Sequence, residues 1–327
     1  MNNQTIIQKI ANRRKIILSI DLDNTLVNRS LGSNYIKPET LEILKKLDKN
    51  KFTIMPNTGR DLVGTRSFFY DTIKLNDAIM GSGSVIMAEG KVYFNSASEF
   101  LSDITEDTIK AVENGITPFI DIYYDKGRII FYNEEQKETY QDLFYQQNPQ
   151  DWFNGELPPS FPVSLVKDKL PTNIFRIEFP VLKKYKELYE SLINKNNKAM
   201  EEWLKIIKSD VKYEEYSIKR KKFFCQNFQQ ELTFARLEKR EGIVNKGIGL
   251  EQWLEIKKID IANTSIVHIG DQDQGLINDT VIKQNIPQAI IIMVGNKCSL
   301  NNTEVDLYLP GDVDVNLFEL FSRLTNL

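Results

Sequence analysis

Short runs of aliphatic residues recur along the first ninety positions and again after position 245. The run IILSI at 16–20 has four aliphatic residues in five, and the run TSIVHIG at 264–270 has three in seven; both are typical of strands buried on both faces of a parallel sheet. Between such runs, apolar residues recur with helical spacing, as at Leu41, Leu44 and Leu47. Strands that alternate with helices predict a doubly wound, Rossmann-like α/β core built on a parallel sheet.

The alternation is interrupted in the middle of the chain. After a short strand expected at 78–80, the stretch VIMAEGKVYFN at 85–95 predicts a β-hairpin that turns at Glu89-Gly90. The proline-rich stretch 147–171 has little periodicity and predicts a long loop, and helical patterns follow at about 181–206. The middle of the chain is therefore expected to form an inserted α+β domain.

Length agrees with a division into two domains. At 327 residues the chain is longer than one compact core usually grows. We predict a discontinuous core at residues 1–88 and 238–327, with the inserted domain at 89–237.

Composition and charge narrow the classes of partner. The chain is 41% hydrophobic and 27% charged, with a formal net charge of −3, as expected for a folded protein without a basic excess. Nucleic acids and anionic membranes bind proteins that have an excess of positive charge, so this composition argues against both as partners. Cys225 and Cys298 lie far apart and form no metal-ligand spacing, and no stretch is typical of a signal peptide or a membrane span. A cytoplasmic protein is the expectation, and the oligomeric state is not predictable.

Residues suited to chemistry follow the predicted core strands. Because the carboxyl ends of parallel strands meet at one edge of a sheet, these residues are expected to converge there. They are Asp21 and Asp23 after the first strand, Asn57, Thr58, Gly59 and Arg60 after the second, Asn245 and Lys246 at a helix start, and Asp271, Asn278 and Asp279 after TSIVHIG.

This set of side chains suits phosphoryl transfer through an aspartyl-phosphate. A carboxylate can act as the covalent nucleophile, and a second carboxylate two positions later can move the proton of the leaving group. A hard divalent cation such as Mg²⁺ is needed between phosphate and carboxylate, which repel each other. A hydroxyl group and a lysine can neutralise charge in the transition state.

The ordered motifs DLDNTLV, NTGR, NKG, IGD and ND resemble those of the haloacid dehalogenase (HAD) superfamily of phosphohydrolases. The large α+β insert between NTGR and NKG resembles the cap domain of the branch that contains sugar-phosphate, sucrose-phosphate and Cof-like phosphatases. The resemblance implies a phosphoric monoester hydrolase with a Mg²⁺ cofactor. It also implies a small phosphorylated metabolite, such as a sugar or polyol phosphate, as the substrate.

The resemblance also implies a role for each matching residue. Asp21 would be the nucleophile and a metal ligand, and Asp23 would be the general acid and base while its backbone carbonyl binds the metal. Thr58 would hydrogen-bond the transferring phosphoryl group, and Lys246 would stabilise its charge. The remaining matches are Asp271 and Asp279 as metal ligands and Asn57, Gly59, Arg60 and Asn278 as residues that bind substrate or phosphate.

The last motif departs from the usual pattern of the superfamily. Six residues separate Gly270-Asp271 from Asn278-Asp279, where relatives usually have two. Asp273 is therefore a rival to Asp279 for the second acidic position. Asn24 stands where many relatives have glycine.

Each motif has an ordinary structural explanation when it is taken alone. An aspartate after a strand often caps a helix, Asn245 can be a simple N-cap, and His268 within an apolar strand is more typical of a hydrogen-bonded core histidine. The combination of motifs in this order favours the enzyme. Three other functions stay open: a phosphotransferase or phosphomutase, an inactive binding or regulatory protein of the same fold, and a phosphatase of macromolecules that docks through 147–171.

Overall fold

The chain forms two compact units. One, the core unit, consists of Met1–Asn95 with Val244–Leu327, and the other, the insert unit, is Ser96–Ile243. The sequence-predicted boundaries, 88/89 and 237/238, lie within about seven residues of these divisions. The structure is a computed structural model, and it describes residues 3–28, 35–69, 73, 76–99, 102–147, 157–181, 216–225, 230–239, 242–272, 279–296 and 302–327.

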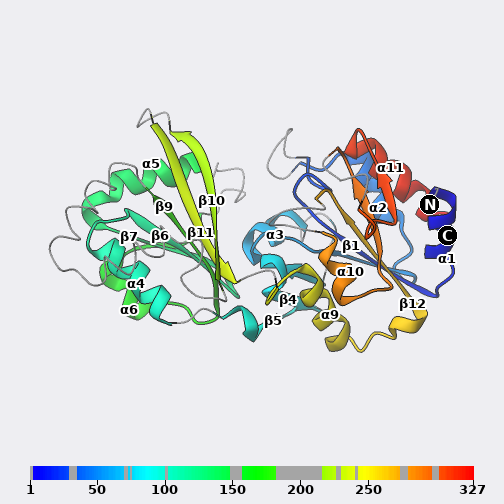
Figure 1. The fold of residues 1–327 in the computed structure, drawn as a ribbon, viewed down its shortest axis with the longest axis horizontal. Helices are drawn as coiled ribbons and strands as arrows, with labels where there is room; N and C mark the ends of the chain where they lie inside the picture. The colour runs from blue at the N-terminus through cyan, green and yellow to red at the C-terminus, as the bar shows by residue number, and fades with distance from the viewer. Residues whose placement is uncertain are drawn as a thin grey trace. The chain divides into compact units, whose positions relative to one another are not determined.

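A parallel five-stranded sheet forms the centre of the core unit (Figure 1). Its strands, in spatial order, are β14 (Leu307–Leu309), β13 (Ile290–Val294), β12 (Thr264–Gly270), β1 (Lys15–Ile20) and β2 (Phe52–Pro56). The strand β1 pairs with β12 on one side and with β2 on the other, so segments from opposite ends of the chain meet at the middle of the sheet. This sheet confirms the predicted doubly wound α/β core.

Both faces of the central sheet are buried, which explains the nearly continuous apolar runs. Along β1, Ile16, Leu18 and Ile20 enter one hydrophobic cluster, whereas Ile17 enters a second cluster on the opposite face. Successive residues of a strand point to opposite faces, so each face needs its own apolar set. Ser19 shares the face of Ile17 and is fully buried.

Helices cover the two faces of this sheet. Residues of α1, α2 and α11 belong to the first cluster, and residues of α9 and α10 belong to the second. The helix α2 begins at Pro38, whose fixed φ suits the first helical position. The helices of the core unit are α1 (Asn3–Ala11), α2 (Pro38–Lys46), α3 (Leu62–Phe69), α9 (Lys246–Ile256), α10 (Val281–Asn285) and α11 (Val313–Leu324), with 3₁₀ turns η1 (Gly81–Gly83) and η6 (Ile261–Asn263).

A small antiparallel sheet follows β2 along the chain. It consists of β3 (Ala78–Met80), β4 (Val85–Ala88) and β5 (Lys91–Phe94). The predicted hairpin is confirmed, and its turn residues Glu89 and Gly90 have φ of 52° and 76°, as a type I′ turn requires. The strand β3 belongs to this sheet and not to the parallel one, because only a single bridge, between Asn57 and Ile79, joins it to the end of β2.

The insert unit contains a six-stranded sheet in which every pairing is antiparallel except that of β7 with β8. The spatial order is β10 (Tyr216–Cys225), β11 (Gln230–Lys239), β9 (Ile174–Val181), β6 (Phe119–Tyr124), β7 (Gly127–Tyr132) and β8 (Ser160–Pro162). Its helices are α4 (Ser102–Glu113), α5 (Lys137–Gln147) and α6 (Val166–Lys169), with 3₁₀ turns η2 (Ser96–Ser98), η3 (Glu134–Gln136) and η5 (Val163–Leu165).

The sequence-predicted loop at 147–171 is wrong where the structure describes it. Residues 157–171 contain β8, η5 and α6, and these short elements bury Val163 and Val166 and leave Phe161 half-buried. The strand β9 is a further element that the sequence did not predict. The predicted helical region at 181–206 lies outside the described residues, apart from Val181, which ends β9.

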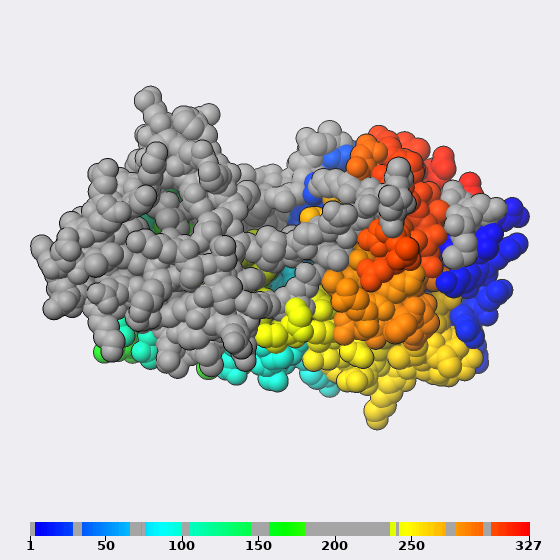
Figure 2. Space-filling model, viewed as in Figure 1, coloured from blue at the N-terminus to red at the C-terminus, as the bar shows by residue number. Residues whose placement is uncertain are grey.

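The N-terminal and C-terminal segments lie side by side in the core unit. In Figure 2 the blue surface of the first residues borders the orange and red surface of the last ones. The Nζ atom of Lys51 also donates to the backbone oxygen of Leu327 at 2.8 Å. Among the helices that the structure describes, none combines the length and apolar character needed to cross a membrane.

Candidate active site

Asp21 directly follows β1, at the carboxyl edge of the central sheet. Its backbone N–H donates to the carbonyl of Ile269 in β12 at 2.8 Å, which continues the ladder of β1 by one residue. The turn that follows contains Asn24 with a φ of 63°, a left-handed conformation that Asn adopts more readily than most residues. This explains why Asn can stand where many relatives have glycine. The turn leaves the Asp21 side chain buried at the sheet edge.

Lys246 reaches Asp21 from the first turn of α9. The side chain of Asn245 accepts from the backbone N–H of Ile248 at 2.8 Å and so fixes the start of this helix. The Lys246 ammonium donates to Asp21 Oδ1 at 2.7 Å and to Asp279 Oδ1 at 2.5 Å, and it is buried. Burial acts to lower the pKa of Lys246, but the carboxylates of Asp21 and Asp279 outweigh it, so the pKa is raised and the ammonium stays charged.

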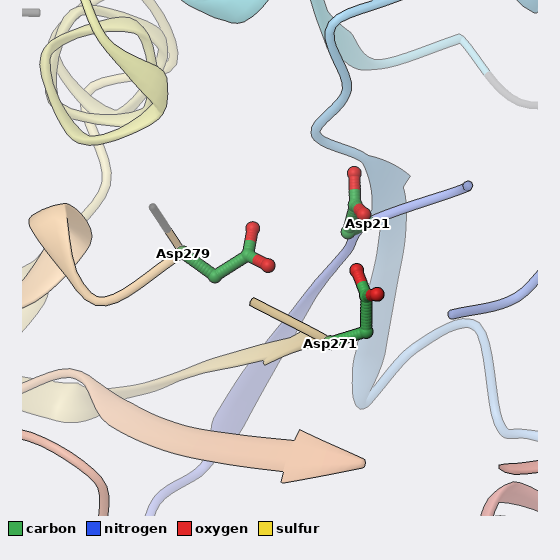
Figure 3. A group of neighbouring side chains, drawn as sticks. All are labelled: Asp21, Asp271 and Asp279. Atoms are coloured by element: carbon green, nitrogen blue, oxygen red, sulfur yellow. The ribbon is translucent and has the colours of Figure 1, made fainter. Parts of the chain in front are cut away.

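Three buried carboxylates meet beside this lysine. One oxygen from each of Asp21, Asp271 and Asp279 lies within 4.8 Å of the others. Figure 3 shows the three side chains directed toward a shared space, with Asp271 at the end of β12 beside Asp21. Burial is the largest cause that raises the pKa of Asp21, to about 7; Lys246 opposes the rise and the other two carboxylates add to it. The group as a whole thus carries more negative charge than Lys246 balances.

Asp279 is held by several donors besides Lys246. Its Oδ2 accepts from the backbone N–H of Gln272 at 3.2 Å, and its own N–H donates to the Gln272 carbonyl at 2.8 Å. His268 Nε2 lies 3.1 Å from its Oδ1. Burial pushes the pKa of Asp279 upward, but Lys246 and His268 outweigh that effect and lower it, so the carboxylate is ionised. Asp279 is therefore part of the cluster, while its rival Asp273 lies outside the described residues.

Gly270 allows Asp279 to approach the sheet. A Cβ atom at position 270 would lie 2.3 Å from both Cγ and Oδ2 of Asp279, far inside van der Waals contact. We expect Gly270→Ala to push the Asp279 carboxylate away from Lys246 and to lower the free energy of unfolding by about 1–3 kcal/mol. Chemical denaturation measures this loss. The control is Gly90→Ala, where an added Cβ meets open space but φ is 76°. Its loss of stability measures backbone strain without a steric clash. An unchanged stability for Gly270→Ala would contradict the steric explanation.

The turn at 57–60, which the sequence predicts to bind phosphate, follows the end of β2. Thr58 donates its backbone N–H to Ile79 at 2.9 Å, and its carbonyl accepts from Ser82 at 3.0 Å. Its hydroxyl Oγ1 accepts from the N–H of Arg60 at 3.1 Å. Hydrogen bonds to β3 and to η1 thus fix the backbone of Thr58. Ser82 itself has a φ of 56°, between two glycines that also have positive φ.

Asn57 and Arg60 make contacts that the sequence did not predict. The Asn57 amide is fully buried and donates to Ser19 Oγ and to the carbonyl of Lys246, both at 3.2 Å. Arg60 donates through Nη2 to Asp23 Oδ1 at 2.6 Å and through Nε to both carboxylate oxygens of Asp23 at 3.2 Å. A paired guanidinium of this kind fixes the orientation of a carboxylate. The predicted phosphate contacts of Asn57, Gly59 and Arg60 stay predictions.

The structure therefore brings together most of the residues that the sequence singled out. Asp21, Lys246, Asp271 and Asp279 form one buried group, and Asp23 is paired with Arg60. Asn278 lies outside the described residues. Sequence reasoning missed the part played by His268 and Ser19. The available signal was a polar residue, Ser19 or His268, placed between aliphatic residues near the carboxyl end of each strand.

The chain resembles known proteins both in sequence profile and in fold. The profile of a family described as haloacid dehalogenase-like hydrolase matches residues 18–279. Sugar phosphatase BT4131 of HAD subclass IIB has a similar fold (TM-score 0.55, 15% identity, over 92% of this chain and 95% of that one). So does the phosphatase BT1666 from Bacteroides thetaiotaomicron (TM-score 0.56, 14% identity, 97% of each chain). A HAD/COF-like hydrolase from Plasmodium vivax has a TM-score of 0.59 at 15% identity, over 98% and 99% of the two chains. A search of curated proteins found no match.

Proposed function

The chain belongs to the haloacid dehalogenase-like hydrolase family, and on that premise we propose that it is a Mg²⁺-dependent phosphatase of small phosphorylated metabolites. The observation that carries the proposal is the buried group in which Lys246 binds Asp21 and Asp279 beside Asp271. A carboxylate nucleophile, a fixed cation and further acidic ligands are the parts that an aspartyl-phosphate mechanism needs.

The residues present fit a magnesium ion. Asp21, Asp271 and Asp279 offer hard carboxylate oxygens within 4.8 Å of one another, which suits a small oxygen-binding cation. When the three carboxylates are ionised, the Lys246 ammonium leaves two negative charges unbalanced among these four side chains, which equals the charge of one divalent ion. The backbone carbonyl of Asp23 is proposed as a further ligand. When bound, Mg²⁺ would offset the repulsion between the phosphate and these carboxylates.

The chain's own residues account for each step of the proposed reaction. Lys246 engages Asp21 Oδ1, which leaves Oδ2 to form a bond to phosphorus as the bond from phosphorus to the alcohol oxygen breaks. For this step Asp23 must first take up a proton from solvent, and it then gives that proton to the alcohol oxygen. Asp23 then takes a proton from water as the water attacks phosphorus, which releases inorganic phosphate and restores Asp21. Thr58 and Lys246 are proposed to bind the phosphoryl oxygens during both steps.

A sugar or polyol phosphate is the proposed class of substrate. The structurally similar BT4131 is a sugar phosphatase, and the net charge of −3 does not favour a polyanionic macromolecule. A cytoplasmic location and the absence of nucleic-acid and membrane partners are part of the same proposal.

A panel of phosphomonoesters tests the proposed function. Purified protein with Mg²⁺ is expected to release inorganic phosphate from sugar or polyol phosphates and to release none after chelation of the metal. Failure to release phosphate from any monoester would contradict the proposal. Transfer of phosphate between two positions of a sugar, without release to water, would instead identify a phosphotransferase or phosphomutase.

Magnesium is also expected to stabilise the protein in the absence of substrate. A ligand present at a hundred times its dissociation constant adds about 2.7 kcal/mol to the free energy of unfolding, or roughly 5–10 °C in Tm for a domain of this size. A thermal melt with and without Mg²⁺ measures the shift. Asp271→Asn should abolish it, whereas Asp314→Asn, at a buried carboxylate bonded to Asn28, should keep it. Equal shifts in both variants would rule out this metal site.

A further inference from the structure

Two polar side chains face each other inside the apolar part of the central sheet. Ser19 in β1 and His268 in β12 are paired in register, and both are fully buried. They lie on the sheet face whose other members, Ile17 and Ile266, belong to the apolar cluster under α9. Burying such groups is costly unless they are hydrogen-bonded, so an apolar pair would be the simpler choice for this position. The presence of a polar pair at this position indicates that Ser19 and His268 serve the functional site at this edge of the sheet.

These side chains belong to a closed ring of hydrogen bonds that includes the proposed catalytic lysine. Ser19 Oγ lies 3.0 Å from His268 Nδ1, and His268 Nε2 lies 3.1 Å from Asp279 Oδ1. On the other side, the Asn57 amide lies 3.2 Å from Ser19 Oγ and 3.2 Å from the Lys246 carbonyl. Lys246 itself closes the ring, since its ammonium donates to the same Asp279 oxygen at 2.5 Å.

The direction of every hydrogen bond in the ring follows from groups that can only accept. The backbone carbonyl of Lys246 accepts, so Asn57 must present its NH₂ group, which then also donates to Ser19 Oγ. The Asp279 carboxylate accepts as well, so the neutral imidazole must carry its proton on Nε2. His268 Nδ1 is then left as an acceptor for the Ser19 hydroxyl proton. The arrangement selects a single tautomer of His268.

We propose that Ser19, His268 and Asn57 are positioning residues that together hold Lys246 in place from both of its ends. His268 orients the Asp279 carboxylate that binds the lysine ammonium, and Asn57 holds the carbonyl of the same lysine. Within the described part of the chain, none of the three hydrogen-bonds to the proposed nucleophile Asp21 through its side chain, and their effect on it passes through Lys246 and Asp279. This inference rests on the proposed function, because Lys246 and Asp279 are its reacting and metal-binding groups.

Through this ring, side chains of β1 and β12 help to hold the Lys246 ammonium in position. The backbone pairing of the two strands alone does not do this. The Lys246 ammonium is the end of a long side chain with several rotatable bonds, and its charge must face the phosphoryl group within a narrow range of positions. Hydrogen-bonded partners behind a metal ligand typically contribute about 10- to 100-fold to metal affinity or activity. We expect a contribution of this size from the ring.

The tautomer of His268 tests the ring without any assay of activity. The chain contains one histidine, so the ring nitrogen signals of ¹⁵N-histidine-labelled protein need no assignment once any affinity tag is removed. The expected result is a neutral imidazole protonated at Nε2, with and without Mg²⁺. A proton on Nδ1, or rapid exchange between the tautomers, would overturn the proposal whether or not the protein is a phosphatase.

Substitutions test whether the ring positions Lys246 during turnover. Ser19→Ala is expected to lower kcat about tenfold with little change in KM. Its matched control is Ser265→Ala, a buried serine of β12 that donates to the Ile10 carbonyl at 2.9 Å, away from the site, and it should keep kcat unchanged. Equal losses in the two variants would show a structural effect only and would overturn the proposal.

Two replacements of His268 distinguish the effect of its N–H donor from the effect of the volume of its imidazole. His268→Gln keeps an N–H donor that can reach Asp279, and His268→Leu removes it. We expect kcat to fall about 10- to 100-fold in the leucine variant and to be rescued in large part in the glutamine variant. Equal kcat values for both variants and the wild type would overturn the positioning role. If the leucine variant does not fold, the tautomer and the pair of serine variants decide. If the wild type releases no phosphate at all, the proposed function fails, and the tautomer alone decides whether the ring exists.

Discussion

Replacing Asp21 with asparagine is expected to lower turnover by on the order of 10⁴-fold or more, while the fold is retained. The amide of asparagine has nearly the same shape but cannot form the acyl-phosphate bond. Lys246 loses one carboxylate partner but keeps Asp279, so the ammonium does not become an unpaired buried charge. Steady-state release of phosphate from the best substrate of the panel measures the loss.

Stability measurements separate the loss of a nucleophile from damage to the fold. Burial and the two neighbouring carboxylates raise the pKa of Asp21 to about 7 against the opposing effect of Lys246, so ionisation of Asp21 costs more in the folded metal-free protein than in water. The Asp21→Asn variant should therefore melt no earlier than the wild type when Mg²⁺ is absent. Asp314→Asn, outside the site, serves as the control with unchanged turnover. Turnover by Asp21→Asn within tenfold of the wild type would disprove the nucleophile assignment.

Replacing Lys246 with methionine is expected to affect both activity and stability. The ammonium is the shared partner of two buried carboxylates, and removal of one member of a buried ion pair typically costs about 3–5 kcal/mol of stability. Methionine retains most of the volume of the lysine stem, so little of this loss comes from a cavity. Turnover should fall about 10²- to 10³-fold, as it does when other enzymes lose a transition-state donor. Denaturant titration and phosphate release measure the two effects.

The control for this substitution lies at the other end of the same helix. Lys257 caps the C-terminus of α9 and binds Glu89 at 2.6 Å, where Glu89 is largely exposed to solvent. An ion pair whose carboxylate is open to solvent contributes little, so Lys257→Met should change stability less than Lys246→Met does, and turnover not at all. Added Mg²⁺ should recover part of the stability of Lys246→Met, since it supplies positive charge to the same carboxylates. Equal stability of Lys246→Met and Lys257→Met would contradict the conclusion that Lys246 offsets the charge of the buried carboxylates.

The core of the fold and the main residues of the site could be predicted from the sequence for one physical reason. A parallel sheet brings the carboxyl ends of its strands to one edge, so residues that directly follow buried apolar runs must meet there. Asp21 and Asp271 each follow such a run by one position. Lys246 was predictable because it begins a helix after the point where the βα alternation resumes.

The remaining features depend on contacts that the sequence does not encode locally. The pairing of Ser19 with His268 depends on the register between two strands that are 249 residues apart. A shift of one residue would turn His268 to the other face of the sheet. The inward direction of the Asn57 amide depends on the carbonyl of Lys246, which is 189 residues away in the sequence.

In the insert unit, the charged residues of β9 conceal the fact that this strand is buried. The sequence of β9 alternates apolar residues with Arg176 and Glu178, a pattern that usually marks a face exposed to water. In the structure both side chains are buried, because Arg176 pairs with Glu238 and Glu178 pairs with Arg236 on β11. These cross-strand ion pairs exist only once β11 is in place, so the sequence of β9 alone gives no sign of its burial.

The discontinuity of the core unit has a consequence for the order in which the protein folds during its synthesis. The central strand β1 pairs with β12, which leaves the ribosome only after the whole of Ser96–Ile243 has been made. At about 5–20 residues per second, roughly 10–50 s separate the synthesis of the two strands. The insert unit is continuous in sequence and can fold during this interval, whereas β1 must wait with the edge that pairs with β12 unpaired and with apolar side chains exposed. Nascent chains of this protein should therefore depend most on chaperones before β12 emerges, and the site that joins Asp21 to Lys246, Asp271 and Asp279 cannot form before that point.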